Sequence, residues 1–310
     1  MKKLTIALLS GGNSSEREVS LNSGRQVYEA LDKAKYNVLN YDPKSDLKQL
    51  VNDADKIDAA LIILHGPNGE DGTVQGLLDL LGIPYQGAGV LGSALAMNKW
   101  VAKQLFEKAG LPVPPYIALK RGERLDTESI VQQLDLPLVV KPASAGSSVG
   151  MSLVRKAADL PAALTEAFQH GPVILVEKYI RGIEITGGVL GNDDLAALPL
   201  IEIIPDSSHD FFDYEAKYVA GVSQEICPAR VEPAVTQKAQ HYAVTAHKAL
   251  HCRGYSRTDM IVDQNEIYVL ETNTIPGMTR TSLFPQAAQK AGYSFSQLMD
   301  RLIELSLEEQ

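Results

Sequence analysis

Residues 256–274 read SRTDMIVDQNEIYVLETNT, and this stretch decides the fold of the C-terminal half. Its two apolar runs around DQNE predict a strand hairpin over 257–273. Side chains alternate between the two faces of a strand. If Asp259 faces Glu271, one face therefore carries Arg257, Asp259, Glu271 and Asn273. The opposite face then carries an apolar set suited to a core, namely Met260, Val262, Tyr268 and Leu270. A bulge at the turn would shift this register.

The polar face of the hairpin combines two carboxylates with an amide oxygen. Such hard oxygen ligands suit Mg²⁺, which usually takes few ligands from the protein and the rest from phosphates and water. The face therefore indicates a metal bound together with a nucleotide. Taken alone, the same residues also fit a polar strand face turned toward solvent.

The rest of the chain alternates between strands and helices. Strands over 4–9, 37–41 and 58–64 with helices between them predict a parallel sheet covered by helices. Loops at the carboxyl ends of such strands usually bind ligands, and Glu16 and His65 lie in two of them. A helix over 93–109 ends at Gly110, and the following LPVPP indicates a domain boundary near 95–115.

Strands over 136–141, 151–155 and 173–178 follow, and the chain is strand-rich from 183 onward. Further helices are predicted over 74–81, 158–168, 233–250 and 294–306. The segment SSHDFFDYEAKYVAGVSQ, residues 207–224, has no clear period and is long for a loop in a compact domain. Its length indicates a functional lid.

Three glycine-containing loops are candidates for ligand binding. Lys141 is followed by PASAGSSVG, whose small residues let the backbone approach an anion; a plain hairpin turn is the alternative. HGPNGEDGTVQG, residues 65–76, offers His65 to a substrate, although a lone histidine is more often structural. NTIPGMTRTSLFP, residues 273–285, offers the Gly277 amide and the Ser282 hydroxyl to a carboxylate, unless it is only a turn.

Composition restricts the class of protein. The chain has 310 residues, of which 45% are hydrophobic and 22% charged, so two or three globular units are expected. A net charge of −9 argues against nucleic acid as a partner. Cys227 and Cys252 lack metal-like spacing and are expected to be reduced. The apolar run in MKKLTIALLSGG is too short for a signal peptide, and no stretch is long enough to span a membrane. We therefore expect a cytoplasmic protein.

In this order, the segments resemble the D-alanine–D-alanine ligases of the ATP-grasp superfamily. The resemblance runs through GGNSSEREVSLNSG, HGPNGEDGTVQG, YQGAGVLGSALAMNK, KPASAGSSVG, VEKYIRGIE, FFDYEAKY, RTDMIVD and LETNTIPGMTRTSLFP, nearly the whole chain. It implies an α/β fold of three domains with ATP held between the last two. These are an N-terminal parallel sheet unit (1–95), a central α+β unit (96–180) and a C-terminal α+β unit (181–310) with a lid over 206–223.

The resemblance also implies the site residues. The catalytic residues would be Glu16, Ser147, Tyr218, Arg257 and Gly277. The D-alanines would be contacted by His65, Ser282 and Leu283. ATP would be bound by Lys99, Lys141, Glu177, Lys178, Ile180, Glu184 and Lys217. Two Mg²⁺ ions, with Mn²⁺ as a substitute, would be bound by Asp259, Glu271 and Asn273.

In the implied roles, Glu16 holds the ammonium of the first D-alanine, and Ser147 and Tyr218 join it to the loop after Lys141 and to the lid. Arg257 and the Gly277 amide form the oxyanion site. The reaction is the ATP-dependent joining of two D-alanines through a D-alanyl phosphate for peptidoglycan synthesis, by a homodimer. Tyrosine at 218 favours D-alanine over D-lactate as second substrate.

Two segments depart from commoner family sequences. Ser144 and Ala145 stand where many relatives carry charged residues, and the lid reads FFDY instead of FYDY. Both bear on substrate affinity or loop motion. Another ATP-grasp enzyme and a nucleotide-binding module without activity are the rival interpretations. A nicotinamide-dependent oxidoreductase is disfavoured, since GGNSSE follows the first strand in place of G-x-G-x-x-G.

Overall fold

The structure, a computed structural model, describes residues 2–123, 126–144, 146, 149–205 and 223–308. The strands are β1 Leu4–Ser10, β2 Tyr36–Tyr41, β3 Ala59–Ile63, β4 Tyr116–Lys120, β5 Leu138–Pro142, β6 Ser152–Val154, β7 Val173–Lys178, β8 Ile183–Gly191, β9 Ala196–Ala197, β10 Ile201–Pro205, β11 Ser223–Ile226, β12 Gly254–Asp263 and β13 Glu266–Asn273. The α-helices are α1 Arg17–Ala30, α2 Leu47–Asn52, α3 Thr73–Leu80, α4 Val90–Met97, α5 Lys99–Lys108, α6 Thr127–Leu134, α7 Leu160–Gln169, α9 Pro233–Ala249, α10 Leu283–Lys290 and α11 Phe295–Leu307. The predicted residues Ser147, Lys217 and Tyr218, and nearly all of the predicted lid, lie outside this description.

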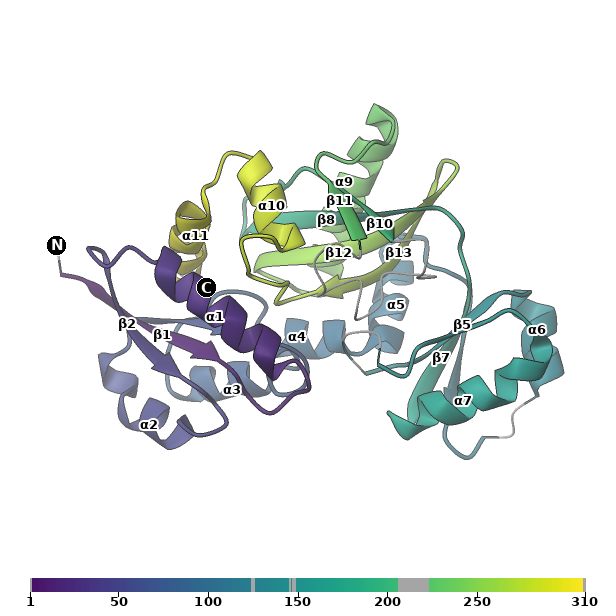
Figure 1. Ribbon diagram of the computed structural model, residues 1–310, viewed down its shortest axis with the longest axis horizontal. Coiled ribbons are helices and arrows are strands. Elements are labelled where there is room, and N and C mark those ends of the chain that lie inside the picture. Colours follow the sequence, from purple (N-terminus) through teal and green to yellow (C-terminus); the bar gives the residue numbers. More distant parts are fainter. Residues whose placement is uncertain (1, 124–125, 145, 147–148, 206–222, 309–310) are drawn as a thin grey trace.

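The first sheet is parallel, in the order β2-β1-β3. Every residue of β3 is buried, which is typical of a parallel strand covered on both faces. Val27 of α1 and Leu302 of α11 belong to the core on one face, and Leu50 of α2 and Leu78 of α3 to the core on the other. The predicted parallel sheet is thus confirmed, and a C-terminal helix completes its cover (Figure 1).

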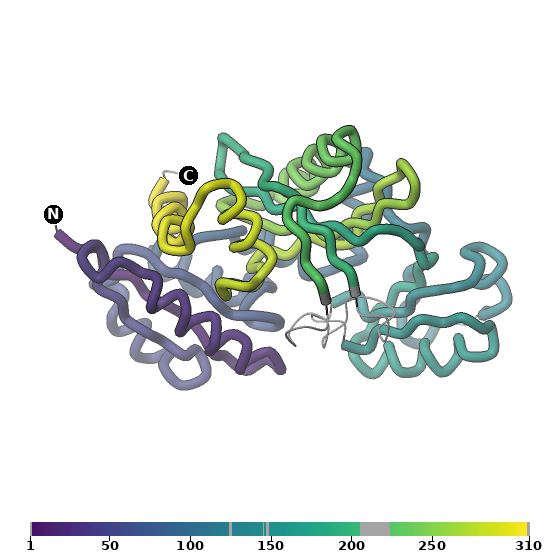
Figure 2. The backbone as a smooth tube through the Cα atoms, turned by 45° about the horizontal axis from the view of Figure 1, so that its top comes forward, coloured from purple at the N-terminus to yellow at the C-terminus, as the bar shows by residue number. Residues whose placement is uncertain are grey.

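The other two sheets are antiparallel. The central sheet has the order β4-β7-β5-β6, and helices α6 and α7 pack on one of its faces. The larger sheet has the order β11-β10-β8-β12-β13, with β9 beside β8. It lies between the other two sheets both in Figure 1 and in the turned view of Figure 2. The α/β architecture with mixed sheets is the predicted one, whereas the domain boundaries at 95 and 180 stay predictions.

The helix predicted over 93–109 is wrong as a single element, because two helices stand there. Asn98 has an extended backbone between α4 and α5, and its side chain accepts a hydrogen bond from the Val101 amide at 3.2 Å. The next amide, of Lys99, donates to the Ala143 carbonyl at 2.7 Å instead of continuing α4. An asparagine cap and a backbone contact distant in sequence therefore break the helix at Asn98 and tie the start of α5 to the segment after β5.

The predicted hairpin register is confirmed in one half and wrong in the other. Asp259 faces Glu271, and Arg257 faces Asn273, as expected. A bulge follows, so that Met260 faces Val269 and Leu270 has no partner across the hairpin. The residues on the core face are therefore Met260, Val262, Ile267 and Val269. Tyr268 and Leu270 are only half-buried, and Leu270 lines the cleft described below. Because a bulge adds one residue to a strand, the side chains of β13 before Leu270 point to the opposite face from the one that the regular alternation predicts.

The structure also bears on the expectations for the two cysteines and for membrane-spanning segments. Cys227 and Cys252 are both free thiols. Within the part of the chain that the structure describes, no helix combines the length and apolar character needed to cross a bilayer.

Candidate active site

A cleft of about 1040 Å³ lies where the three sheets approach one another. It brings together every predicted site residue that the structure describes. These lining residues are Glu16, His65, Lys99, Lys141, Glu177, Lys178, Ile180, Glu184, Arg257, Asp259, Glu271, Asn273, Gly277, Ser282 and Leu283. They come from segments as far apart as α1 and α10, so the fold assembles in space what the sequence spreads over the chain.

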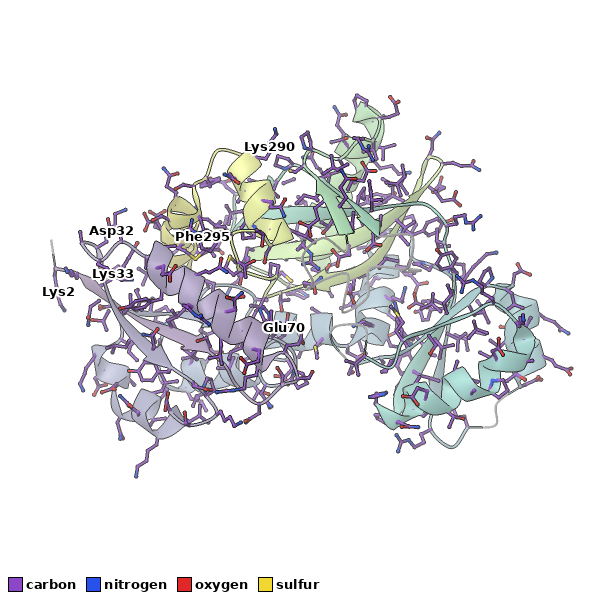
Figure 3. All side chains as sticks on the ribbon, viewed as in Figure 1. Lys2, Asp32, Lys33, Glu70, Lys290 and Phe295 are labelled. Carbon is purple, nitrogen blue, oxygen red and sulfur yellow. The ribbon has the colours of Figure 1, made fainter. Side chains whose placement is uncertain are left out.

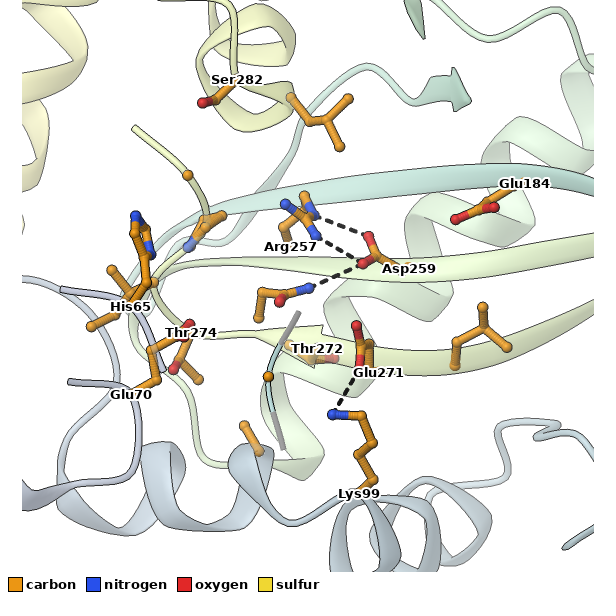
Figure 4. A pocket seen from close by; sticks show the side chains of 18 of the residues that line it. His65, Glu70, Lys99, Glu184, Arg257, Asp259, Glu271, Thr272, Thr274 and Ser282 are labelled. Carbon is orange, nitrogen blue, oxygen red and sulfur yellow. Dashed lines mark hydrogen bonds and ion pairs between the residues drawn. The ribbon is translucent and has the colours of Figure 1, made fainter. Parts of the chain in front are cut away.

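Asp259 lies in the cleft within reach of several hydrogen-bond donors (Figure 4). The guanidinium of Arg257 donates to both carboxylate oxygens, from Nε to Oδ1 at 3.0 Å and from Nη2 to Oδ2 at 2.8 Å. Asn273 Nδ2 donates to Oδ2 at 3.1 Å, and the buried Thr186 hydroxyl donates to Oδ1 at 2.6 Å. Three neighbours thus fix the orientation of this carboxylate, and a two-pronged arginine contact is the most directional of them.

Glu271 lies on the same strand face and meets a lysine from across the cleft. Lys99 Nζ is 3.1 Å from Glu271 Oε2 (Figure 4). Asp259, Glu271 and Asn273 together offer carboxylate and amide oxygens, the donor chemistry that fits Mg²⁺. Among the described residues no group of three or more His, Cys, Asp or Glu gathers as a metal site. Mg²⁺ bound here would take its remaining ligands from phosphates and water, as it usually does.

A second charged cluster lies on the central sheet. Glu177 Oε1 is 3.0 Å from Lys141 Nζ and 3.2 Å from Lys103 Nζ, and all three side chains are largely buried. Burial opposes the charge of Glu177, but Lys103 and Lys141 outweigh it and hold its pKa below the ordinary value. Burial in turn lowers the pKa of Lys103 to about 8. The cluster is a carboxylate shared by two ammonium groups.

Glu16 is where three loops meet. A β-carbon at Gly66 would lie 2.9 Å from Glu16 Oε2, and one at Gly146 would lie 3.2 Å from it. Gly66 also has a positive φ of 72°. The loop after β3 and the loop after β5 therefore approach Glu16 as closely as they do because they carry no side chain there.

Asp42, at the end of β2, fixes the loop that carries Glu16. Its Oδ1 accepts from the amides of Gly12 and Lys44 at 2.9 Å each, and Oδ2 forms an ion pair with Arg17 at 2.6 Å. Arg17 in turn donates to the Gly12 carbonyl at 2.9 Å. Burial opposes its charge, but the Arg17 pair and these amides lower the pKa of Asp42 to about 2. The residue beside Glu16 is thus fixed through a permanently charged acid.

Glu70 and His65, from the loop after β3, form the wall of the cleft on the side of the first sheet (Figure 4). Burial, with Glu16 nearby, raises the pKa of Glu70 from 4.5 to about 8, although the Gly66 amide donates to its Oε2 at 2.7 Å. Burial also lowers the pKa of His65. Figure 3 shows Glu70 toward the middle of the molecule, whereas Asp32 and Lys33 lie at its outer end. This wall is therefore mostly uncharged near neutral pH.

The raised pKa of Glu70 gives a test by stability. An acid whose pKa is higher in the folded protein costs stability as pH rises from its unfolded value of 4.5 to about 8. Each unit is worth about 1.4 kcal/mol, so we expect Glu70→Gln to gain roughly 3–5 kcal/mol over wild type between pH 4.5 and 8. Urea unfolding at pH 5, 6.5 and 8 measures the gain. Glu29→Gln, at an exposed position of α1, is the control; a constant difference for Glu70→Gln would contradict the assignment.

The segment 274–283 closes the end of the cleft opposite the central sheet. Ser282 and Leu283 stand at the start of α10. Ser282 Oγ accepts from the Thr279 amide at 3.1 Å, and a β-carbon at Gly277 would lie 3.0 Å from that oxygen. The N-terminus of a helix attracts anions through its amides and dipole. This end of the cleft therefore suits a carboxylate.

Sequence reasoning missed four residues of this site. Lys103 and Thr186 contact predicted residues, Glu70 lines the cleft, and Asp42 pairs with Arg17 beside Glu16, but none of the four was named as a candidate. Glu70 carried a signal, because it lies inside the loop quoted for His65. The other three act through contacts between segments far apart in sequence.

Comparison with known proteins gives matches over nearly the whole chain. A family model described as D-ala D-ala ligase C-terminus matches residues 105–304, and one described as D-ala D-ala ligase N-terminus matches 5–50 and 41–88. A D-alanine–D-alanine ligase of Syntrophobacter fumaroxidans is 64% identical over 308 residues, 99% of each chain. One of Desulfotalea psychrophila is 53% identical, over 99% of this chain and 96% of the relative.

Solved structures agree with these matches. The D-alanine–D-alanine ligase of Bacillus anthracis complexed with ATP is 36% identical and superposes with a TM-score of 0.86, over 98% of this chain and 97% of that one. A D-Ala:D-Ser ligase of Enterococcus faecalis is 35% identical with a TM-score of 0.86, over 99% and 100%.

Proposed function

This chain belongs to the D-alanine–D-alanine ligase family, and from that premise we infer that it joins two D-alanines with ATP for peptidoglycan precursor synthesis. The observation that carries the inference is the single cleft in which the acids of β12 and β13 face Lys99 and Lys141. Acids and lysines in one cleft suit a substrate that carries both phosphates and a metal.

The first half-reaction activates a carboxylate. A carboxylate is a poor acyl donor, so we propose that the first D-alanine attacks the terminal phosphate of ATP to give D-alanyl phosphate and ADP. Glu16 holds the ammonium of that D-alanine, while His65 lines its pocket. Lys99 and Lys141 hold the phosphates together with Lys217, and adenine and ribose lie against Glu177, Lys178, Ile180 and Glu184. Ser147 and Tyr218 complete the enclosure, which keeps water from the acyl phosphate.

The second half-reaction forms the peptide bond. The amine of the second D-alanine attacks the acyl carbon, and phosphate leaves. Arg257 and the Gly277 amide stabilise the negative oxygen of the tetrahedral intermediate. Ser282 and Leu283, at the start of α10, bind the carboxylate of the second D-alanine.

The metal is part of the proposal. We propose that Asp259, Glu271 and Asn273 hold two Mg²⁺ ions, with Mn²⁺ as a substitute, because their oxygens are of the kind that Mg²⁺ prefers. Bound there, the metal offsets the negative charge of the phosphates during transfer. Thr186 and Arg257 keep the Asp259 carboxylate oriented for that task.

The proposal is tested by product analysis. Purified protein is given ATP and Mg²⁺ with D-alanine, D-lactate, L-alanine or bicarbonate in parallel, and released phosphate and the product mass are measured. We expect phosphate release and D-alanyl-D-alanine with D-alanine alone. Preferred turnover of bicarbonate or an L-amino acid would favour another ATP-grasp enzyme, and no turnover would favour a binding module without activity.

The family also leads us to propose a cytoplasmic homodimer. Light scattering on the purified protein at micromolar concentration measures its mass, and a mass of one chain would contradict the dimer.

Asp42→Ala tests how the first substrate is held. The change removes the acceptor of two amides and of Arg17, so the loop of Glu16 loses its fixed position. We expect KM for D-alanine at the first site to rise about tenfold, in line with the loss of one charge-assisted hydrogen bond, while KM for ATP stays within twofold. Steady-state kinetics measure both. Asp55→Ala, at an exposed position of the 3-10 helix Ala54–Lys56, is the control, and an equal rise in both KM values would indicate general damage.

A further inference from the structure

Lys103 carries a charge in a place where a charge is costly. Its side chain is fully buried on α5, yet it belongs to none of the groups that the proposed reaction uses. Its Nζ lies 3.2 Å from Glu177 Oε1 and 5.5 Å from the centre of the Tyr116 ring. A buried ammonium group loses its hydration, which is costly unless an opposite charge compensates for it. The function of Lys103 is therefore expected to depend on its partner Glu177.

Glu177 is shared by two lysines through one oxygen. Lys141, on the neighbouring strand β5, lies 3.0 Å from the same Oε1 that Lys103 contacts. The register sets Val139 opposite Glu177 and Lys141 opposite Leu175, so both charged side chains leave the sheet on the face turned to α5. The other face, with Val140 and Val176, packs on the core of the central unit. The cluster thus contains two positive charges and one negative charge.

The two lysines differ in their access to a ligand. Lys141 lines the cleft, and its side chain is 11% exposed. The side chain of Lys103 is 0% exposed, and this residue does not line the cleft. Lys141 can therefore turn toward an anion in the cleft, whereas Lys103 has no access to it and stays beside Glu177. If Lys141 turned away in a protein without Lys103, Glu177 would remain as a buried charge without a partner, which is strongly unfavourable.

We propose that Lys103 is a positioning residue for nucleotide binding: it is the permanent counter-ion of Glu177 and so releases Lys141 to the phosphates of ATP. The proposal rests on the proposed function, because it takes the cleft to be the ATP site. In this proposal Lys103 contacts neither the adenine nor the phosphates of ATP, but it links Glu177 at the adenine to Lys141 at the phosphates.

The experiment measures binding without turnover. Calorimetry follows a non-cleavable ATP analogue with Mg²⁺, and adenosine by competition, in wild type, Lys103→Met, Glu177→Gln and the double variant. Lys108→Met, at the exposed end of the same helix, is the matched control. Product formation by wild type is measured separately, so failure of the proposed function is seen there and failure of this inference only in the binding series.

For Lys103→Met we expect the Kd of the ATP analogue to rise about tenfold or more, since Lys141 must then leave a carboxylate that has no other partner. Adenosine, which has no phosphate to attract Lys141, should bind within twofold of wild type. In the Glu177→Gln background the same lysine change should alter the Kd of the analogue by less than about twofold, because no buried acid then holds Lys141.

Three results would overturn the proposal. One is an unchanged Kd of the analogue in Lys103→Met, and another is an equal loss of adenosine and analogue binding. The third is a tenfold loss from Lys103→Met that persists in the Glu177→Gln background. If Lys103→Met fails to fold, the double variant is compared with Glu177→Gln, and a tenfold loss between these two would still overturn the proposal.

Discussion

Arg257→Ala should lower kcat by about 100- to 1000-fold, the range typical for removal of one oxyanion donor. Its guanidinium has five N–H donors, of which Asp259 takes two in the two-pronged contact. Asp259 keeps hydrogen bonds from Asn273 and Thr186 after the change, so the acid stays oriented. Ground-state binding should therefore suffer little, and KM for ATP and D-alanine should stay within about threefold.

Two further variants serve as the control and as the conservative change for this result. Arg25→Ala makes the same change at an exposed position of α1 and should keep the wild-type kcat. Arg257→Lys retains the charge but not the planar fork, and we expect it to recover less than a tenth of the lost rate. Steady-state and single-turnover kinetics separate chemistry from product release. A wild-type kcat in Arg257→Ala would remove this residue from the oxyanion site.

The polar half of the hairpin could be predicted because a strand has a period of two. Arg257, Asp259, Glu271 and Asn273 needed only correct pairing at one point to share a face, and that pairing holds. The parallel first sheet could be predicted for a similar reason, since its buried strands are short apolar runs separated by helices. Local periodicity thus determined both the sheet and the acids that line the cleft.

Features that depend on contacts between distant segments could not be predicted in this way. The bulge opposite Asp259 moves Leu270 into the cleft without any glycine to mark it. The break at Asn98 depends on the Ala143 carbonyl, which takes the amide of Lys99. Lys103 has the spacing of an ordinary helix residue, and only its contact with Glu177 of β7 in the folded chain shows that it is buried beside an acid.

Glu271→Gln should raise the Mg²⁺ concentration for half-maximal activity by roughly a hundredfold. The amide keeps the shape of the side chain and one oxygen donor, but it removes a full charge. A pair of unit charges 4 Å apart is worth about 1 kcal/mol in water and about 4 kcal/mol at a site near the protein surface, which brackets the roughly 3 kcal/mol of a hundredfold change. Glu271 is partly buried, at 24% exposure, so the upper part of that range applies.

The same change removes one carboxylate partner of Lys99, whose Nζ lies 3.1 Å from Glu271, and with it one interaction that competes with phosphate for this ammonium, so ATP affinity should be partly maintained. Metal and nucleotide binding are therefore expected to respond differently, with a large loss for Mg²⁺ and at most a threefold change for the nucleotide measured without metal. Calorimetric titration of Mg²⁺ into protein with ADP, and of ADP without Mg²⁺, measures the two. Glu266→Gln, at the exposed start of the same strand, should change neither. If the Mg²⁺ titration of Glu271→Gln matched that of wild type, Glu271 would not be a metal ligand, and the metal would have to be held by Asp259 and Asn273.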